Sequence, residues 1–387
     1  LNGTPLVDEL GGGKMLVYEN ADSTGYYAYI NDLESIGYEF YDDNDLNGNL
    51  FSTYISDENV VTVSYLPNVN NQLNILVEPM RELATSEEDN IYVDKNIQSS
   101  VTLVTTAFIG KSNGACIIYQ LCDGSFIIID AGHGYTHKVS YPDTYQDQAK
   151  VIYNTLMNLL PEGQEKPVIA AWFISHAHND HIGGMIPFAD LYADAVTVER
   201  FIVNFPDHDS LQDVWRKNSD LNYIRIRELQ EAFAKFDGAV LVEAHAGQTF
   251  HIRNAEIDIL STWELMTESY ADMTSITYGN ESSLVFDVKL EGERMMILND
   301  VNYKSVELLE TLYDADFLKS DFVQVAHHGY DDVSSLYEKI NADIVLWCEK
   351  TAGYLTSHNA VLADLEIYAA GTGITYIPLP YAGDGTK

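Results

Sequence analysis

Long apolar runs, cysteines and basic residues are all scarce in this sequence, and each scarcity excludes something. No run of about 18 apolar residues occurs, so no segment is expected to cross a membrane. Cys116, Cys122 and Cys348 are an odd number without metal-binding spacing, which implies buried free thiols and no disulfide framework. The chain has 21 basic against 59 acidic residues, and its net charge of −38 is spread along its length, which disfavours nucleic acid and anionic membranes as partners.

Common motifs for side-chain nucleophiles and nucleotides are also missing. The sequence contains no G-x-S-x-G nucleophile elbow, and Gly11-Gly12-Gly13-Lys14 lacks the spacing and the hydroxyl of a phosphate loop. The chain starts at Leu1 without a basic-then-apolar leader, which leaves the compartment open. We expect the cytoplasm, with an exported form as the alternative.

The length of 387 residues exceeds the usual size of one compact core, so we expect two domains, residues 1–97 and 98–387. Residues 1–12 are polar and glycine-rich and are predicted to be a flexible lead-in. A helical apolar stripe at residues 23–36 precedes four short strand patterns at 38–41, 50–56, 60–66 and 73–77. This order indicates a small α+β domain, and the acidic stretch 84–97 marks its end.

One segment of this domain resembles the start of a calcium loop, Asp43-Asn44-Asp45-Leu46-Asn47-Gly48. The position that needs a bidentate glutamate is Tyr54, however, and the flanking residues follow strand patterns. We therefore interpret Asn47-Gly48 as a hairpin turn in which both residues have positive φ.

The second domain is organised around Ser175-His176-Ala177-His178-Asn179-Asp180-His181-Ile182-Gly183-Gly184, which follows a buried-strand pattern at residues 167–174. In an extended chain, residues two apart point to the same side, so His176 and His178 can bind one metal ion. Asp180 and His181 project from the turn that follows and could serve a second ion beside the first. Three histidines and an aspartate within six residues favour a metal site over surface-loop histidines.

This run resembles the H-x-H-x-D-H signature of the metallo-β-lactamase-fold hydrolase superfamily. The resemblance implies an α/β fold, the αββα metallo-β-lactamase sandwich, for residues 98–387. It also implies that Asp130, at the strand end Asp130-Ala131-Gly132, supports the metal-binding loop from behind; an ordinary strand-end aspartate is the alternative.

Later strand ends supply further candidate ligands. Strand patterns at 283–290 and 294–298 end at Asn299-Asp300, and another at 321–326 runs into His327-His328-Gly329. A strand pattern at 342–348 is followed by His358 and a helix predicted over 360–370. His245 and His251 fall where many superfamily members carry a third histidine, but neither has a convincing local context.

The order of these motifs most resembles the branch that includes the DNA-uptake competence protein's domain and phosphorylcholine esterase. Carried over by position, the resemblance implies two ions bridged by Asp300: one is bound by His176, His178 and one of His327 or His328, and the other by Asp180, His181 and His358. We favour His328 as the ligand and His327 as a hydrogen-bond donor to developing negative charge. His178 replaces an aspartate usual in the DNA-uptake branch, which further disfavours a nucleic-acid substrate.

The resemblance implies a dinuclear hydrolase that uses a metal-bound hydroxide, with Asp180 orienting the nucleophile. We expect two divalent ions, zinc first, with manganese or iron as alternatives. The expected substrate is a phosphodiester on a small or surface-displayed molecule, and another ester, a thioester or a lactam is the alternative. A binding protein that keeps the fold and the metal without turnover is the contrasting hypothesis.

Overall fold

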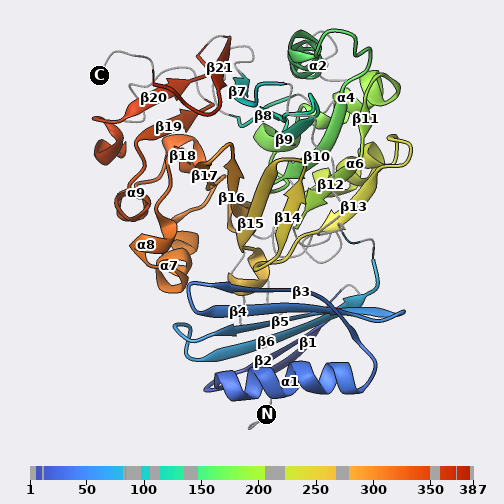
Figure 1. Ribbon diagram of the computed structural model, residues 1–387, viewed down its shortest axis with the longest axis vertical. Helices are drawn as coiled ribbons and strands as arrows, with labels where there is room; N and C mark the ends of the chain where they lie inside the picture. The colour runs from blue at the N-terminus through green and yellow to red at the C-terminus, as the bar shows by residue number, and fades with distance from the viewer. Residues whose placement is uncertain are drawn as a thin grey trace.

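The computed structural model describes residues 6–10, 13–81, 83, 97–104, 114–134, 147–204, 223–266, 279–348, 358–371 and 373–383. Its strands form three sheets, and the first of them lies at the lower end of the molecule in Figure 1. This N-terminal sheet is antiparallel, with the order β1-β2-β6-β5-β4-β3. Its strands are β1 (Leu6–Leu10), β2 (Gly13–Tyr18), β3 (Glu39–Leu46), β4 (Asn49–Ile55), β5 (Asn59–Leu66) and β6 (Gln72–Pro79).

One helix, α1 (Ser23–Ser35), covers one face of the N-terminal sheet and confirms the predicted α+β arrangement. It begins at Asp22, whose side chain accepts a hydrogen bond from the Gly25 amide at 2.8 Å. The expectation of a flexible lead-in is wrong for residues 6–10, because they form β1 on the edge of β2. Pairing with a free strand edge satisfies the backbone hydrogen-bonding groups of this segment. The segment is too short to show the periodic pattern that would predict a strand.

The hairpin interpretation of Asn47-Gly48 is confirmed. The two residues have φ values of 59° and 81° and connect β3 to β4. The Asp45 carboxylate accepts a hydrogen bond from the Gly48 amide at 2.7 Å, so it serves the turn.

The other two sheets come from residues 100–378 and lie face to face. The eight-stranded sheet has the order β13-β12-β10-β9-β8-β7-β21, with β11 beside β10, and the seven-stranded sheet runs in order from β14 to β20. The strands of the first are β7 (Ser100–Val104), β8 (Ile117–Gln120), β9 (Phe126–Ile129), β10 (Val168–Ile174), β11 (Thr197–Val198), β12 (Arg200–Val203), β13 (Val240–Glu243) and β21 (Ile374–Pro378). Those of the second are β14 (Thr249–Ile252), β15 (Ala255–Ser261), β16 (Val285–Leu290), β17 (Glu293–Ile297), β18 (Phe322–Gln324), β19 (Ile344–Trp347) and β20 (Glu366–Ala369).

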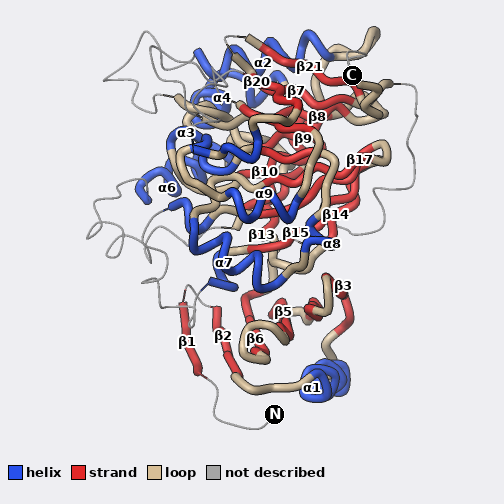
Figure 2. Tube along the Cα trace, turned by 90° about the vertical axis from the view of Figure 1, so that its left-hand side faces the viewer, coloured by secondary structure: helices blue, strands red, loops and turns tan. Residues whose placement is uncertain are grey.

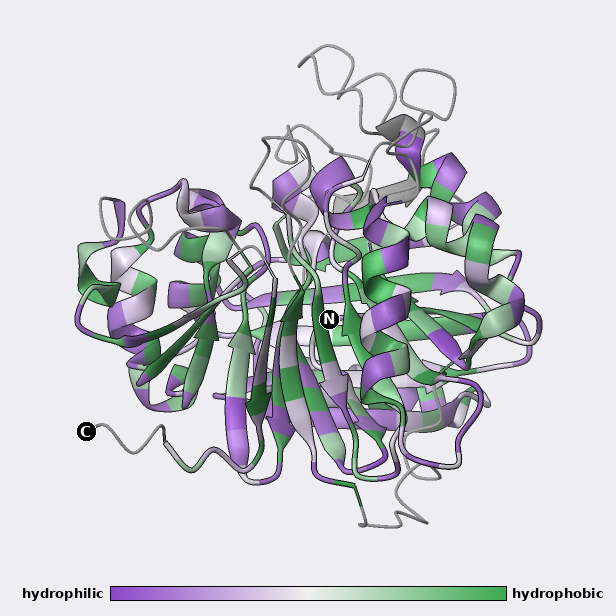
Figure 3. Cartoon of the chain, turned by 90° about the horizontal axis from the view of Figure 1, so that it is seen from above, coloured by the Kyte–Doolittle hydropathy of each residue, from purple (hydrophilic) through white to green (hydrophobic). Residues whose placement is uncertain are grey.

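Helices cover both outer faces of these sheets, which confirms the predicted αββα sandwich (Figures 1 and 2). The eight-stranded sheet is covered by α2 (Asp147–Leu159), α4 (Met185–Tyr192) and α6 (Tyr223–Phe233), and the other by α7 (Tyr303–Leu312), α8 (Ala315–Leu318) and α9 (Ser334–Ile340). Between the sheets, the rings of Phe173 and Phe286 stack with centroids 4.9 Å apart. Figure 3 shows the strands as largely hydrophobic and the outer sides of the helices as hydrophilic. Among the residues that the structure describes, no helix has the length and apolar content that a membrane crossing needs.

The helix predicted over residues 360–370 is wrong. This segment forms a short 3-10 helix, η7 (Ala360–Leu362), and then β20, which pairs in parallel with β19. An open strand edge outweighed a weak helical pattern here, because the ladder satisfies the backbone groups of the segment. The acidic stretch 84–96 lies outside the described residues, and the domain boundary stays a prediction.

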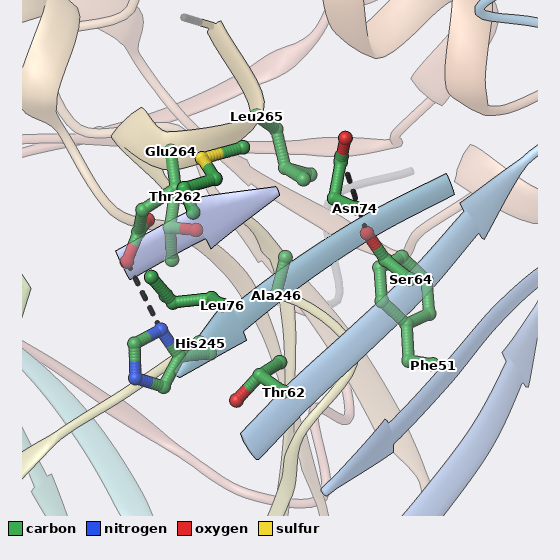
Figure 4. Close-up of a pocket in the computed structure, with 11 residues that line it drawn as sticks. Phe51, Thr62, Ser64, Asn74, Leu76, His245, Ala246, Thr262, Glu264 and Leu265 are labelled. Atoms are coloured by element: carbon green, nitrogen blue, oxygen red, sulfur yellow. Dashed lines mark hydrogen bonds and ion pairs between the residues drawn. The ribbon is translucent and has the colours of Figure 1, made fainter. Parts of the chain in front are cut away.

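The N-terminal sheet packs against the sandwich through the face that α1 leaves open. The Phe51 ring lies on Gly247, where any Cβ would overlap it, and Asn49 Nδ2 donates to the Leu312 carbonyl at 2.8 Å. His245, only 5% exposed, lies with its Nε2 3.0 Å from Glu78 Oε2. Its Nδ1 lies 3.0 Å from Glu264 Oε1 (Figure 4). Burial lowers the pKa of His245, but the two carboxylates outweigh burial and raise it to about 10.

We expect the stability of the protein to depend on pH through this histidine. Because the folded-state pKa is raised above the ordinary 6.5, the stabilisation is complete below pH 6.5 and is lost as the pH rises through about 10. The loss should be of the order of 5 kcal/mol, since the shift from 6.5 to about 10 is multiplied by about 1.4 kcal/mol for each pKa unit. Arg81, which lies 3.8 Å from Glu78 and also contacts Glu243, is the other charge at this junction.

Denaturant unfolding at pH 6 to 10 measures the effect, with His245→Gln as the test variant and His251→Gln, whose ring is 30% exposed, as its control. The alkaline loss should disappear in His245→Gln and persist in His251→Gln. An equal alkaline loss in all three proteins would contradict the expectation.

Candidate metal centre

Three strand ends, one from one sheet and two from the other, deliver the predicted side chains to a common point. After β10 ends at Ile174, the chain passes through His176 and His178 into the short helix α3 (Asn179–Ile182). The end of β17 leads to Asp300, and the end of β18 leads into the 3-10 segment η6 (Ala326–Gly329), which holds His328. The ends of these strands from the two sheets thus lie close together, and the residues that follow them meet there.

Two groups of ligand-type atoms form there, each within a span of 4.8 Å. One consists of His176, His178 and Asp300, and the other of Asp180, His181 and His328. Asp300 contacts both groups, with one oxygen 3.1 Å from His181 Nε2 and the other 3.4 Å from His328 Nε2 and 3.7 Å from His176 Nε2. The geometry therefore places the Asp300 carboxylate between two candidate ion positions.

The donor atoms of this cluster fit divalent cations. Within the described part of the chain, the buried His176 Nε2 and Asp300 Oδ1 have no hydrogen-bond partner. His181 Nε2 and His328 Nε2 face each other at 3.3 Å. Imidazole nitrogens and carboxylate oxygens that converge in this way are the ligands that zinc, iron and manganese accept.

Asp130 lies behind the cluster and fixes the ring of His181. Its carboxylate accepts hydrogen bonds from the Ser175 amide at 2.8 Å, from the Ser175 hydroxyl at 2.7 Å and from His181 Nδ1 at 2.5 Å. With Nδ1–H donated to Asp130, His181 Nε2 is left free to bind a cation. These contacts suit the supporting role that the sequence suggests, which we keep as a proposal.

The imidazole of His176 is oriented in a similar way by hydroxyl groups. Ser175 Oγ lies 2.9 Å and Ser283 Oγ lies 3.2 Å from His176 Nδ1. Sequence reasoning missed both serines. Ser175 could have been found by its place next to His176, whereas Ser283 has no motif around it.

Two unusual backbone positions shape the site. Gly183 packs so closely on Gly134 and the Asn179 carbonyl that any Cβ would overlap them, so the backbone segments approach closely at this corner. Asn299 has a φ of 52°, a left-handed conformation that asparagine tolerates. Its side chain also donates to the Leu284 carbonyl at 2.6 Å.

The electrostatics around His176 and Asp300 favour cation binding. Burial, together with the neighbouring His181 and His178, holds the pKa of His176 well below its usual value. Burial raises the pKa of Asp300, but His181 and His328 outweigh burial and hold that pKa well below the usual value. A neutral imidazole and an ionised carboxylate are the forms that bind metal. Burial lowers the pKa of His181, but Asp300 and Asp130 outweigh burial and raise that pKa to about 10, so an ion must displace a proton there.

The two adjacent histidines of η6 have different environments. His327 and His328 have φ values of 42° and 54°, and this left-handed turn buries His328 in the cluster while His327 stays 25% exposed. His327 Nδ1 donates to Asp331 at 2.6 Å, and Asn280 Nδ2 donates to His327 Nε2 at 2.9 Å. His328 therefore belongs to a ligand group. His327 is held beside it by Asp331 and Asn280, neither of which lies in a recognisable sequence motif.

The structure does not bring His358 to the other candidate ligands. Its side chain is exposed, and neither ligand group includes it. The neighbouring Asn359 is buried instead, donating to the Gly329 carbonyl at 3.4 Å and accepting from the Val333 amide at 3.2 Å. Asn359 thus supports the turn that carries His328, and our proposals below use six ligands and leave His358 out.

We expect Asp130→Asn to weaken zinc binding by about 10–100-fold, because the hydrogen bond that orients His181 loses its charge. Zinc competition with a chromogenic chelator measures the affinity. Asp123→Asn is the matched control, since Asp123 also accepts several hydrogen bonds but from Ser125 and Arg253, outside the cluster. Equal zinc affinities in both variants would contradict the role of Asp130.

Comparisons with known proteins were made for both sequence and structure. The model of the metallo-beta-lactamase superfamily matches residues 109–257, and no curated protein sequence matches the chain. Similar solved structures include the metallo-beta-lactamase fold protein YhfI from Bacillus subtilis, at 10% identity over 72% of this chain and 99% of that chain, with a TM-score of 0.41.

Two further similar structures are enzymes. The diiron beta-hydroxylase CmlA from Streptomyces venezuelae shows 11% identity over 73% of this chain and 54% of that chain, with a TM-score of 0.40. The short form of human tRNase Z shows 14% identity over 73% and 99%, with a TM-score of 0.38. On the family match to residues 109–257, the chain carries a domain of the metallo-beta-lactamase superfamily.

Proposed function

We propose that this protein is a dinuclear metal-dependent hydrolase. The observation that carries the proposal is the position of Asp300 between two groups of histidine and aspartate side chains. One ion would be held by His176, His178 and Asp300, and the other by Asp180, His181, His328 and the same Asp300. Zinc is the metal we expect, with manganese and iron as alternatives.

When bound, two divalent ions would supply an activated water nucleophile and would polarise the oxygen atoms of the substrate. The chain's own residues would orient the reactants. Asp180 lies with one oxygen 3.5 Å from His328 Nε2 and has a 19% exposed side chain, so it reaches the open side of the cluster. There its carboxylate can accept a hydrogen bond from the attacking water and hold it in line with the substrate.

His327 is the second residue for which we propose a part in the reaction. It lies outside both ligand groups, is partly exposed and is oriented by Asp331 and Asn280. When a substrate takes the place of Asn280 at Nε2 and this nitrogen carries a proton, the ring can donate a hydrogen bond to negative charge that develops on the substrate. The left-handed backbone at His327 and His328 gives the two rings different roles. The ring of His328 points into the cluster as a proposed ligand, and the ring of His327 lies beside it.

The substrate that we propose is a phosphodiester on a small or surface-displayed molecule. The net charge of −38 supports a substrate other than a nucleic acid, because a polyanion would be repelled over most of the surface. Another ester, a thioester or a lactam remains the alternative, since each also needs an activated water and a polarised carbonyl or phosphoryl group.

A panel of chromogenic phosphodiesters, carboxylic esters, thioesters and lactams, assayed with added zinc or manganese, tests this function. We expect turnover of at least one phosphodiester and its loss after the metal is removed by a chelator. Asp180→Asn and His327→Ala should each lower kcat by about a hundredfold or more, because each removes a group that acts on the reacting atoms.

His251→Ala is the control for these variants, because His251 is a partly exposed histidine outside both ligand groups. It should retain full activity. Turnover of carboxylic esters or lactams alone would replace the phosphodiester assignment. Two bound ions without turnover of any compound in the panel would favour a binding protein and contradict the hydrolase.

A further inference from the structure

A buried ion-pair cluster joins the N-terminal sheet to the sandwich, and the proposed hydrolase mechanism leaves it unused. Glu78 is at the end of β6, His245 follows β13, and Glu264 lies on the 3-10 helix η3 (Trp263–Met266). All three residues are at most 5% exposed. The ring of His245 contacts Glu264 through Nδ1 (Figure 4) and Glu78 through Nε2, so it ties β6 to η3.

Further hydrogen bonds fix the position of η3 on the sandwich side. Asn204 Nδ2 donates to Glu264 Oε1 at 2.6 Å and to the Ala244 carbonyl at 2.6 Å, while Asn204 Oδ1 accepts from Trp263 Nε1 at 2.7 Å. Apolar packing at this place is incomplete, since a cavity of about 30 Å³ lies between the sheet and η3. The cavity has room for one or two water molecules, so the polar contacts, more than close packing, hold η3 in place.

η3 lies beside a second 3-10 helix, η5 (Gly279–Ser282). The other side of η5 is attached to the start of α7, where Glu281 accepts from Lys304 Nζ at 2.9 Å and from Asn302 Nδ2 at 3.2 Å. η5 therefore lies between a contact to η3 and an ion pair to α7. A displacement of η3 would remove the first of these contacts.

η5 and the residues after it contact three histidines of the candidate metal centre. A Cβ at Gly279 would come within 2.5 Å of His178 Nε2, so the ring of His178 lies directly on the backbone of η5. Asn280 Nδ2 donates to His327 Nε2, and Ser283 Oγ lies 3.2 Å from His176 Nδ1. Both histidines of the first ligand group thus depend on this segment for their orientation.

We propose that Glu78, His245 and Glu264 are positioning residues for the metal centre. They hold η3, and through it η5, against His176 and His178, so that the N-terminal sheet is a working part of the site. The kinetic part of this inference rests on the proposed hydrolase function, whereas the metal-binding part does not. The chemistry of the link is a buried imidazolium between two carboxylates, which loses strength when either carboxylate is made neutral.

Zinc binding to the full chain tests the proposal, with Glu78→Gln as the variant. Titration against a chromogenic chelator gives separate affinities for the first and second ion. We expect Glu78→Gln to weaken one of the two ions by about tenfold and to leave the other within about twofold, because η5 supports only the first ligand group. With a phosphodiester substrate, kcat should fall more than KM rises.

Glu39→Gln is the matched control, since Glu39 is an exposed glutamate of the same sheet, on β3. It should behave as the wild type. Glu264→Gln tests the same link from the sandwich side and keeps an amide oxygen for Asn204, which covers the case that Glu78→Gln fails to fold. Unchanged affinities for both ions in a folded Glu78→Gln or Glu264→Gln variant would overturn the proposal, as would an equal loss for both ions.

The wild-type arm separates this inference from the proposed function. Two ions bound without turnover would contradict the hydrolase alone, and the affinities of the variants would still decide the positioning role. A wild-type chain that binds no zinc would overturn both proposals.

Discussion

The carboxylate of Asp300 lies buried among three imidazole rings, and the arrangement of the whole sandwich serves this contact. A buried charge is costly unless groups of opposite charge or a cation surround it. His181 and His328 lie within 3.4 Å of its oxygens, and His176 approaches to 3.7 Å. Because these residues come from strand ends in both sheets, the two sheets must pack in one register for the site to exist. The apolar layer between them, with Phe173 stacked on Phe286, supplies that register.

The residues behind the rings decide which nitrogen of each ring faces the cluster. Asp130 accepts from His181 Nδ1, and the hydroxyls of Ser175 and Ser283 flank His176 Nδ1. In both cases Nε2 is left for a cation. The site is therefore organised in two shells of contact, and the outer one is distributed over β9, β10 and the segment after η5. Such an arrangement allows the chain to hold ligand atoms close together before any ion is bound.

Much of the fold and of the candidate metal site could be predicted where the evidence lies in residues that are neighbours in the sequence. The alternation of His176 and His178 after a buried strand follows from backbone periodicity, whereas Asp300 and His328 were predicted as ligands from the resemblance to the superfamily. The structure places these four residues together. The predictions for residues 6–10 and for the segment after residue 360 were wrong. Both segments form strands because they pair with the edge of a sheet, and such pairing produces little recognisable pattern in a short sequence. Asn280, Ser283 and the pairing of His245 with Glu78 could not be predicted, since each is a contact between segments far apart in the chain.

X-ray absorption at the zinc edge of the loaded protein can establish whether two ions share the Asp300 carboxylate, as we propose. We expect a ligand shell of nitrogen and oxygen atoms without sulfur, dominated by imidazole, together with scattering from a second metal atom nearby. A single isolated zinc ion, or a shell that contains cysteine sulfur, would contradict this proposal.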